Sequence, residues 1–221
     1  MSRSTFRLAL QKLNLPRFAS SRGSRPFVVA LEGPNGAGKT TLCRKLSRRL
    51  GAPSCLGTDE AWFSETFKTR MIRDAEWHAS AMFFLSGCFE QMRLLRSRAE
   101  KLVVMDRSMW STLAVHAAND PARLSALLAM LRPVGTQVQL PDLTIVLEAS
   151  FATCQSRIAR KTGAARALDN LTATSAFHAR EQLFYRWLAH QTKSVCFLDV
   201  EATAAEVADS AVALVREKVR C

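Results

Sequence analysis

The clearest chemistry in the sequence belongs to one glycine-rich stretch that ends in a lysine and a threonine, GPNGAGKT at residues 33–40. It fits the pattern G-x-x-x-x-G-K-[ST], in which glycines let backbone N–H groups turn inward around a phosphate. Lys39 would bring positive charge to the outer phosphates, and the Thr40 hydroxyl would ligate Mg²⁺. The stretch therefore predicts a site for a nucleoside triphosphate with magnesium. We expect the following residues to form it: Gly33, Asn35, Gly36, Ala37, Gly38, Lys39, Thr40 and Thr41.

A second motif, Asp106-Arg107-Ser108, comes directly after the apolar run LVVM at residues 102–105. A carboxylate at such a strand end would lie near the phosphate-binding loop of an α/β fold. Asp106 could hold Mg²⁺ or orient an attacking oxygen, and Arg107 could clamp the phosphate that accepts the transfer. A surface ion pair at the strand end is the alternative interpretation. We predict Asp106 and Arg107 as catalytic residues beside Lys39, and Asp106 as a metal ligand beside Thr40.

Short apolar runs alternate with longer helical patterns along the chain, which is typical of a parallel sheet wrapped by helices. Several of the runs are β-branched without alternation, as expected of strands covered on both faces. The predicted strands are 27–31, about 53–57, 102–105, 143–147 and 195–199. The predicted helices are 38–50, 60–73, 75–99, 110–131 with a break at Pro121, 150–161, 172–191 and 204–219, with loops at 135–141 and 162–170.

Composition excludes several classes of protein. The chain has 221 residues, 48% of them hydrophobic and 23% charged, which are ordinary globular values. Its longest apolar runs are far shorter than the roughly 20 residues of a membrane span. The six cysteines and four histidines are dispersed, so we predict neither a disulfide framework nor a zinc site. The guanine-reading pattern N-K-x-D is absent, which argues against a GTPase.

Four segments together resemble the thymidylate kinase-like family of P-loop nucleotide kinases, in order and spacing over residues 27 to about 200. They are FVVALEGPNGAGKTTL, VVMDRSMWSTLAVHA, PDLTIVLEASFATCQSRIARK and FHAREQLFYRWLA. The resemblance implies a three-layer P-loop NTPase fold, with a five-stranded parallel sheet, helices on both faces and a basic lid over ATP. It also implies transfer of the ATP γ-phosphoryl group to a nucleoside monophosphate, and a homodimer.

The resemblance also implies roles for individual residues. Arg157, Arg160 and Lys161 fall where the family has its lid helix, and Arg166 lies in the loop beyond. Lid arginines would neutralise the charge that develops between two nucleotides. Tyr185 matches an aromatic residue that the family uses near the acceptor. We therefore add Arg157 and Arg160 to the predicted catalytic residues. The residues that we predict to contact the acceptor are Glu60, Arg73, Phe84, Arg107 and Tyr185.

The sequence departs from the thymidylate members of the family at the acceptor side. Asn35 stands where they carry an acid in the P-loop, and residues 57–62 read GTDEAW in place of R-E-P-G-G. Residues 83–88, FFLSGC, replace the helix whose arginine reads thymine, and D-R-S replaces D-R-Y. The FFLSGC and DRSMWSTLAVHA segments are similar to the UMP–CMP kinase 2 branch, which has F-Y-S-L-G and D-R-Y-W-H-S-T. Strict specificity for dTMP is therefore not expected.

Two activities and one binding role remain open. The leading hypothesis is ATP- and Mg²⁺-dependent phosphorylation of a pyrimidine nucleoside monophosphate (dTMP, UMP or CMP) to the diphosphate, with Arg70, Arg73 and Arg107 meeting the acceptor phosphate. The alternative is a deoxynucleoside kinase. Enzymes of that class carry E-R-S where this chain has D-R-S at 106–108, and after the second strand they carry an acid followed by Trp, as in DEAW at 59–62. Glu60 or Asp59 would then take the proton from a 5′-hydroxyl. The third is a nucleotide-binding regulatory or nucleic-acid-associated protein without transfer activity.

The N-terminal segment is basic and free of acidic residues. The formal net charge is +12, and residues 1–31 contain six Arg or Lys and no Asp or Glu. Phe6, Leu10 and Leu13 follow helical spacing. This composition is typical of an organelle transit peptide or of a basic arm on a bacterial enzyme. We favour the arm and a cytoplasmic enzyme, with a mitochondrial one as the alternative. We divide the chain into an extension, 1–26, and a kinase domain, 27–221. Nucleic acid is not an expected partner, because no aromatic or Gly-Arg interleaving accompanies the charge.

Overall fold

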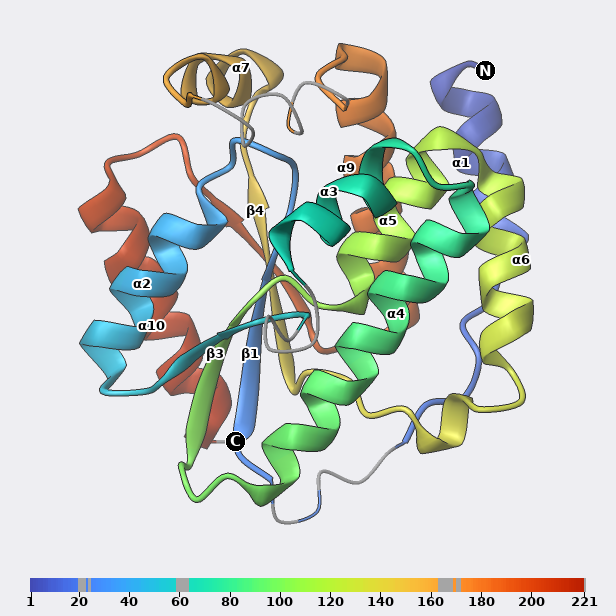
Figure 1. The fold of residues 1–221 in the computed structure, drawn as a ribbon. Coiled ribbons are helices and arrows are strands. Elements are labelled where there is room, and N and C mark those ends of the chain that lie inside the picture. Colours follow the sequence, from blue (N-terminus) through green and yellow to red (C-terminus); the bar gives the residue numbers. More distant parts are fainter. Residues whose placement is uncertain (20–22, 24, 59–63, 163–168, 170–171, 221) are drawn as a thin grey trace.

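Five parallel strands form one sheet in the order β2-β3-β1-β4-β5 (Figure 1). They are β1 (Phe27–Glu32), β2 (Ser54–Leu56), β3 (Leu102–Asp106), β4 (Leu143–Glu148) and β5 (Val195–Asp199). The computed structural model describes residues 1–221 except 20–22, 24, 59–63, 163–168, 170–171 and 221. Because β1 lies between β3 and β4, Leu31 pairs with both Asp106 and Ile145 at the carboxyl edge. This order brings the ends of β1 and β3, where both predicted motifs begin, next to each other.

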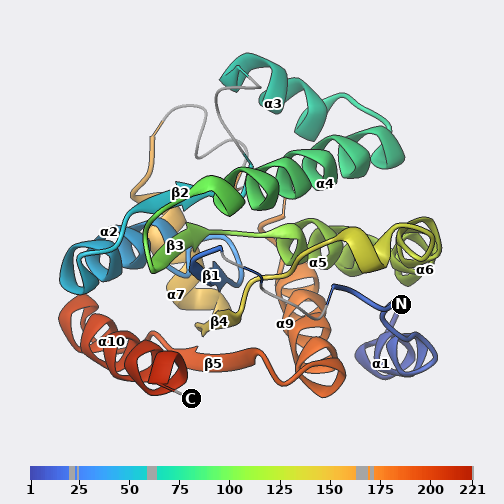
Figure 2. The same cartoon turned by 90° about the horizontal axis from the view of Figure 1, so that it is seen from below.

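Helices cover both faces of the sheet, as predicted (Figure 2). One face is covered by α2 (Lys39–Leu50) and α10 (Ala204–Arg220), and the other by α4 (Trp77–Leu94), α5 (Met109–Asn119) and α9 (Ser175–Gln191). The remaining described helices are α1 (Arg3–Gln11), α3 (Glu65–Arg73), α6 (Pro121–Leu131) and α7 (Phe151–Ala159), with 3₁₀ turns at Leu95–Ser97 and Gly135–Gln137. The three-layer α/β prediction is confirmed.

Side chains of the central strand β1 alternate between the two layers. Val29 and Leu31 pack with α2 and α10, whereas Val28 and Ala30 pack with Met92 and its neighbours on the other face. All four are fully buried. This two-sided burial explains why the strand is an unbroken apolar run in the sequence.

Helix ends differ from the predicted ones in a few places for local reasons. The break predicted at Pro121 is present, because Pro121 opens α6 and the Asp120 side chain caps it through the Ala122 N–H. The predicted helix 172–191 begins at Ser175, because Thr174 caps it. The predicted helix 60–73 is described only from Glu65, and residues 59–63 lie outside the described part.

The N-terminal segment packs against the helices of the second layer. Helix α1 contacts α9 and α6 (Figure 2). Its Phe6 and Leu10 are fully buried in the same hydrophobic core as Trp110. Phe18 continues the contact, with its ring perpendicular to that of Trp110 at 5.9 Å. Among the described residues, no helix is both long enough and apolar enough to cross a membrane. The division at residue 26 stays a prediction.

Candidate active site

The P-loop, residues 33–40, connects β1 to the N-terminus of α2. Gly33, Gly36 and Gly38 have φ angles of 123°, 83° and 102°, which L side chains rarely adopt. A Cβ on Gly33 would lie 2.6 Å from the Leu147 carbonyl oxygen, and one on Gly36 would lie 2.4 Å from that of Cys154. Glycine is therefore required at both positions for the loop to pass β4 and α7. The loop leaves the N–H groups at the start of α2 available to an anion.

A cavity of about 320 Å³ opens at this helix N-terminus. Basic residues line one part of it, and apolar residues from the β5–α10 connection line another. The lining includes Asn35, Gly36, Ala37, Gly38, Lys39, Thr40 and Thr41, together with Lys45, Arg107, Arg157, Val200, Ala204 and Val207. Every predicted triphosphate contact except Gly33 therefore faces this cavity. Its volume and its mixture of charged and apolar walls suit a nucleotide.

Lys39 is buried beneath the loop. Its Nζ donates to the carbonyl oxygens of Gly33 and Pro34 at 2.6 and 2.7 Å. Burial, together with the charge of Arg107, lowers the Lys39 pKa to about 7. The carboxylates of Glu181, Asp106 and Glu32 act in the opposite direction. The charge of Lys39 therefore depends on what binds above it.

Arg107 adopts a left-handed backbone conformation, with φ 70°. Such a conformation costs a non-glycine residue about 1–2 kcal/mol. Its Nη2 donates to Asn35 Oδ1 at 2.6 Å and its Nη1 to Ser111 Oγ at 3.1 Å. Asn35 in turn donates to Thr172 Oγ1 at 3.1 Å. The neutral Asn35 thus holds Arg107 by a hydrogen bond. Thymidylate members of the family that the sequence resembles carry an acid at this position.

The start of the predicted lid is also anchored near the P-loop. Arg157 on α7 donates to the carbonyl oxygens of Ala37 and Val200 at 3.1 and 2.8 Å, and it lines the cavity. Arg160 directly follows α7 as its C-cap and is exposed, outside the cavity lining. Lys161 pairs with Asp169 at 2.6 Å. Arg166 lies outside the described residues. Figure 1 shows α7 over the carboxyl edge of the sheet.

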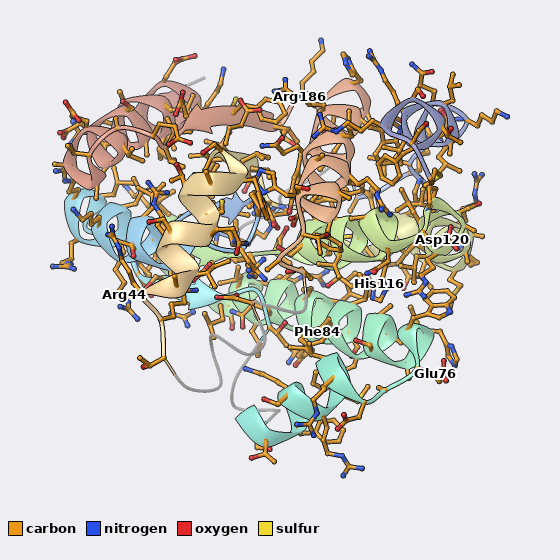
Figure 3. The ribbon with its side chains drawn as sticks, turned by 90° about the horizontal axis from the view of Figure 1, so that it is seen from above. Arg44, Glu76, Phe84, His116, Asp120 and Arg186 are labelled. Atoms are coloured by element: carbon orange, nitrogen blue, oxygen red, sulfur yellow. The ribbon has the colours of Figure 1, made fainter. Side chains whose placement is uncertain are left out.

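The structure separates the predicted acceptor contacts. Arg73 is at the outer end of α3 and pairs with Asp74 at 2.7 Å, with its side chain 62% exposed, away from the cavity. Phe84 lies midway along α4 (Figure 3), with its ring edge-on to Phe83 at 4.9 Å. Tyr185 is fully buried, and its hydroxyl donates to Glu32 rather than facing the cavity. Glu60 lies outside the described residues. Of the members of the predicted set that the structure describes, only Arg107 lines the cavity.

Comparison with known proteins places these features in one family. The sequence model of the thymidylate kinase family matches residues 31–211. The chain belongs to the thymidylate kinase family. It is accordingly a nucleoside monophosphate kinase that uses ATP. The suspected family, its kinase activity and its P-loop are confirmed.

Two thymidylate kinases are similar in sequence to more than half of this chain. The thymidylate kinase of Thermomicrobium roseum is 30% identical over 176 residues, which cover 75% of this chain and 82% of that enzyme. The thymidylate kinase of Leptospira interrogans is 26% identical over 152 residues, 63% of this chain and 72% of that one.

Solved structures share the fold of this kinase at lower identity. Thymidylate kinase from Candida albicans superposes with a TM-score of 0.67 at 17% identity, over 88% of this chain and 94% of that one. Deoxyadenosine kinase from M. mycoides, described with dCMP and dCDP bound, superposes with a TM-score of 0.65 at 16% identity, over 86% and 98%. At these identities the likeness establishes the fold alone.

Sequence reasoning missed two buried carboxylates of this kinase, Glu32 and Glu181. Glu32 ends β1 and accepts hydrogen bonds from Ser108, Ser111 and Tyr185. Glu181 on α9 is buried, and it is the carboxylate that most favours the charge of Lys39. Two signals could have revealed them. Glu32 is an acid at the end of an apolar strand, like Asp106, and Glu181 occurs at the core-facing spacing of α9.

Proposed function

We propose that this kinase transfers the γ-phosphoryl group of ATP, with Mg²⁺, to a pyrimidine nucleoside monophosphate (dTMP, UMP or CMP) and releases the diphosphate. The observation that carries the proposal is the position of Arg107. Its guanidinium lines the same cavity as Lys39 and is anchored between Asn35 and Ser111. A fixed arginine beside the triphosphate site fits an acceptor that brings a phosphate of its own, because a planar guanidinium binds phosphate oxygens.

The ATP side of the proposal rests on the P-loop cavity. The N-terminus of α2 and Lys39 would hold the phosphates, and Thr41 would reach the α-phosphate. Arg157, fixed between Ala37 and Val200, would pass between the phosphates and the apolar part of the cavity. The base of ATP would lie against Val200, Ala204 and Val207.

The oxygen ligands at the P-loop fit magnesium. Thr40 offers a hydroxyl at the start of α2, and Asp106 offers a carboxylate at the end of β3. Within the described residues no group of three His, Cys, Asp or Glu could hold a metal ion alone. This arrangement suits Mg²⁺, which usually combines one or two protein ligands with substrate phosphates and water. When bound, the ion would neutralise phosphate charge.

The chemical step we propose is a direct in-line transfer. The charged residues at the cavity bind and neutralise phosphates, and a metaphosphate-like transition state requires little else from a protein. Lys39 would act at the triphosphate and Arg107 at the acceptor phosphate, with Asp106 orienting the attack. Arg157 and Arg160 would add charge from the lid side, Arg160 only after the chain beyond α7 moves over the cavity.

A pyrimidine acceptor is favoured by the family, and an aromatic group on α3 and α4 offers a surface for its base. The Phe67, Phe83 and Phe84 rings form an edge-on series, with centroid distances of 5.4 and 4.9 Å. Such a group could contact a planar base. The departures FFLSGC and D-R-S still predict that specificity differs from strict dTMP use. A deoxynucleoside kinase would instead need Asp59 or Glu60, which lie outside the described residues.

The assembly and compartment remain predictions of the same proposal. Phe67 and Ile72 on α3 are large apolar side chains exposed on the protein surface, and a homodimer would cover such residues. We keep the cytoplasm as the predicted compartment, with the mitochondrion as the alternative. Light scattering of the purified protein would test the dimer.

The test is ATP consumption with Mg²⁺ against dTMP, dUMP, UMP, CMP, dCMP, AMP and GMP, with the matching nucleosides in parallel. Lys39→Ala serves as the blank. Turnover with pyrimidine monophosphates alone is expected and would identify the base. Turnover with nucleosides alone would contradict the proposal, and so would turnover confined to AMP or GMP.

A further inference from the structure

Glu32 is a fully buried carboxylate at the end of the central strand, directly before the P-loop. Its Oε1 accepts from the Ser108 N–H and hydroxyl at 2.7 and 2.6 Å. Its Oε2 accepts from the Ser111 hydroxyl and, at 3.1 Å, from the Tyr185 hydroxyl. Four donors thus converge on one carboxylate, which satisfies a buried charge that would otherwise be costly.

Two of these donor residues, Ser108 and Ser111, are also connected to Arg107. Ser108 is the next residue in the chain, so the bond to its N–H holds the backbone just after the left-handed Arg107. Ser111 accepts from Arg107 Nη1 while it donates to Glu32, so it connects the two side chains. The backbone of Gly57 also packs close to Arg107: its N–H donates to the Asp106 carbonyl oxygen at 2.9 Å, and a Cβ on it would lie 2.5 Å from the Arg107 carbonyl oxygen.

We propose that Glu32 is a positioning residue, which fixes the backbone and guanidinium of Arg107 so that Arg107 can meet the acceptor phosphate. The proposal rests on the proposed function, in which Arg107 binds that phosphate. Glu32 itself does not line the cavity. Its contribution is to keep a strained conformation in place, as surrounding structure must do for any such backbone.

The charge of Glu32 also bears on this role. Burial raises the pKa of its carboxyl above the usual value, and the hydrogen bonds from Ser108 and Ser111 and the charges of Arg107 and Lys39 only partly oppose that rise. A carboxylate can accept all four bonds, but a neutral amide must use part of its surface as a donor. Replacement by glutamine would therefore preserve the shape and disturb the contacts with Ser111 and Tyr185.

The test compares Glu32→Gln with Glu148→Gln, in the wild-type and Arg107→Ala backgrounds. Glu148 ends the neighbouring strand β4 and pairs with Arg186 outside the site, so it controls for the same chemical change. We expect Glu32→Gln to lower kcat/KM for the monophosphate by about tenfold or more, and to change ATP affinity by less than about threefold. Glu148→Gln should match wild type on both measures.

The Arg107→Ala background shows whether Glu32→Gln acts by misplacing Arg107 or by destabilising the whole protein. If Glu32 acts through Arg107, Glu32→Gln should change the remaining kcat/KM by less than about twofold there. An undiminished effect in that background would overturn the proposal, and so would wild-type acceptor kinetics in Glu32→Gln. If Glu32→Gln does not fold, Ser111→Ala breaks the same connection and takes its place. A wild-type enzyme that turns over no monophosphate would refute the proposed function instead.

Discussion

At the scale of single residues, the buried position of Lys39 predicts that the protein takes up a proton when ATP binds. Burial and the charge of Arg107 hold its pKa near 7 without nucleotide, and a triphosphate placed above it would raise that pKa. At about pH 8 most free protein would carry neutral Lys39 and most bound protein charged Lys39. ATP binding should therefore take up close to one proton at that pH and much less at about pH 6.

Titration calorimetry in two buffers of different ionisation enthalpy would measure this uptake. Lys39→Arg is the matched control, because arginine stays charged in both states and should abolish the uptake at about pH 8. Binding without proton uptake in the wild-type protein would show that Lys39 is already charged in the free state.

Arg107 belongs to the same scale, and its removal should separate the two substrates. Arg107→Ala is expected to lower kcat/KM for the monophosphate by about 100-fold or more, because a fixed phosphate contact is lost. ATP affinity should change by less than about threefold, since Lys39 and the α2 N-terminus remain. Steady-state kinetics with each substrate varied would measure both. Acceptor kinetics that match wild type would contradict the assignment of D-R-S to the acceptor phosphate.

At the scale of elements, the P-loop is held by close backbone contacts, and two of its glycines make a matched pair. Gly36 and Gly38 both have positive φ, but only Gly36 would bring a Cβ against a backbone oxygen. Gly38 would meet only the end of the Arg157 side chain, at 4.0 Å. Gly38→Ala should therefore lower the free energy of unfolding by about 1–2 kcal/mol, the cost of the backbone conformation alone.

Gly36→Ala should cost about 1–3 kcal/mol more than Gly38→Ala, because the loop and α7 would have to separate. Urea unfolding of both variants beside wild type would measure the difference. An equal decrease in the free energy of unfolding for the two variants would contradict this prediction. It would mean that the backbone at Cys154 can move away from a Cβ at residue 36 without a loss of stability.

The elements also show which features a sequence can reveal. The strands and the P-loop were predictable because an apolar run and a G-x-x-x-x-G-K-T stretch are local patterns. The bonds of Glu32 were not, because they join β1 to α5 and α9, and Tyr185 lies 153 residues away in the chain. The position of Arg73 could not be predicted for a related reason: its charge suited a phosphate, but α3 places its side chain on the surface, paired with Asp74. The left-handed conformation of Arg107 has no signal in its residue type.

At the scale of the whole molecule, the N-terminal segment is built into the kinase core. Arg25 pairs with Asp142 at 2.6 Å, and Asp142 also accepts from the Val28 N–H, so the segment is joined to the start of β1 and β4. Helix α1 then packs on α9, which carries Glu181 and Tyr185. A basic arm would be expendable to the fold, but this packing ties residues 1–18 to the layer behind the active site.

Phe6 gives a direct test of that packing. It is fully buried, whereas Leu8, two residues away on the same helix, is 60% exposed. Phe6→Ala should lower the free energy of unfolding by about 3–5 kcal/mol, because a large side chain leaves a cavity between α1 and the helices beneath it. Leu8→Ala should change it by less than about 0.5 kcal/mol, as expected at the surface. Urea unfolding of the full chain would measure both. Wild-type stability in Phe6→Ala would show that α1 detaches in solution, and that residues 1–26 behave as a separate extension.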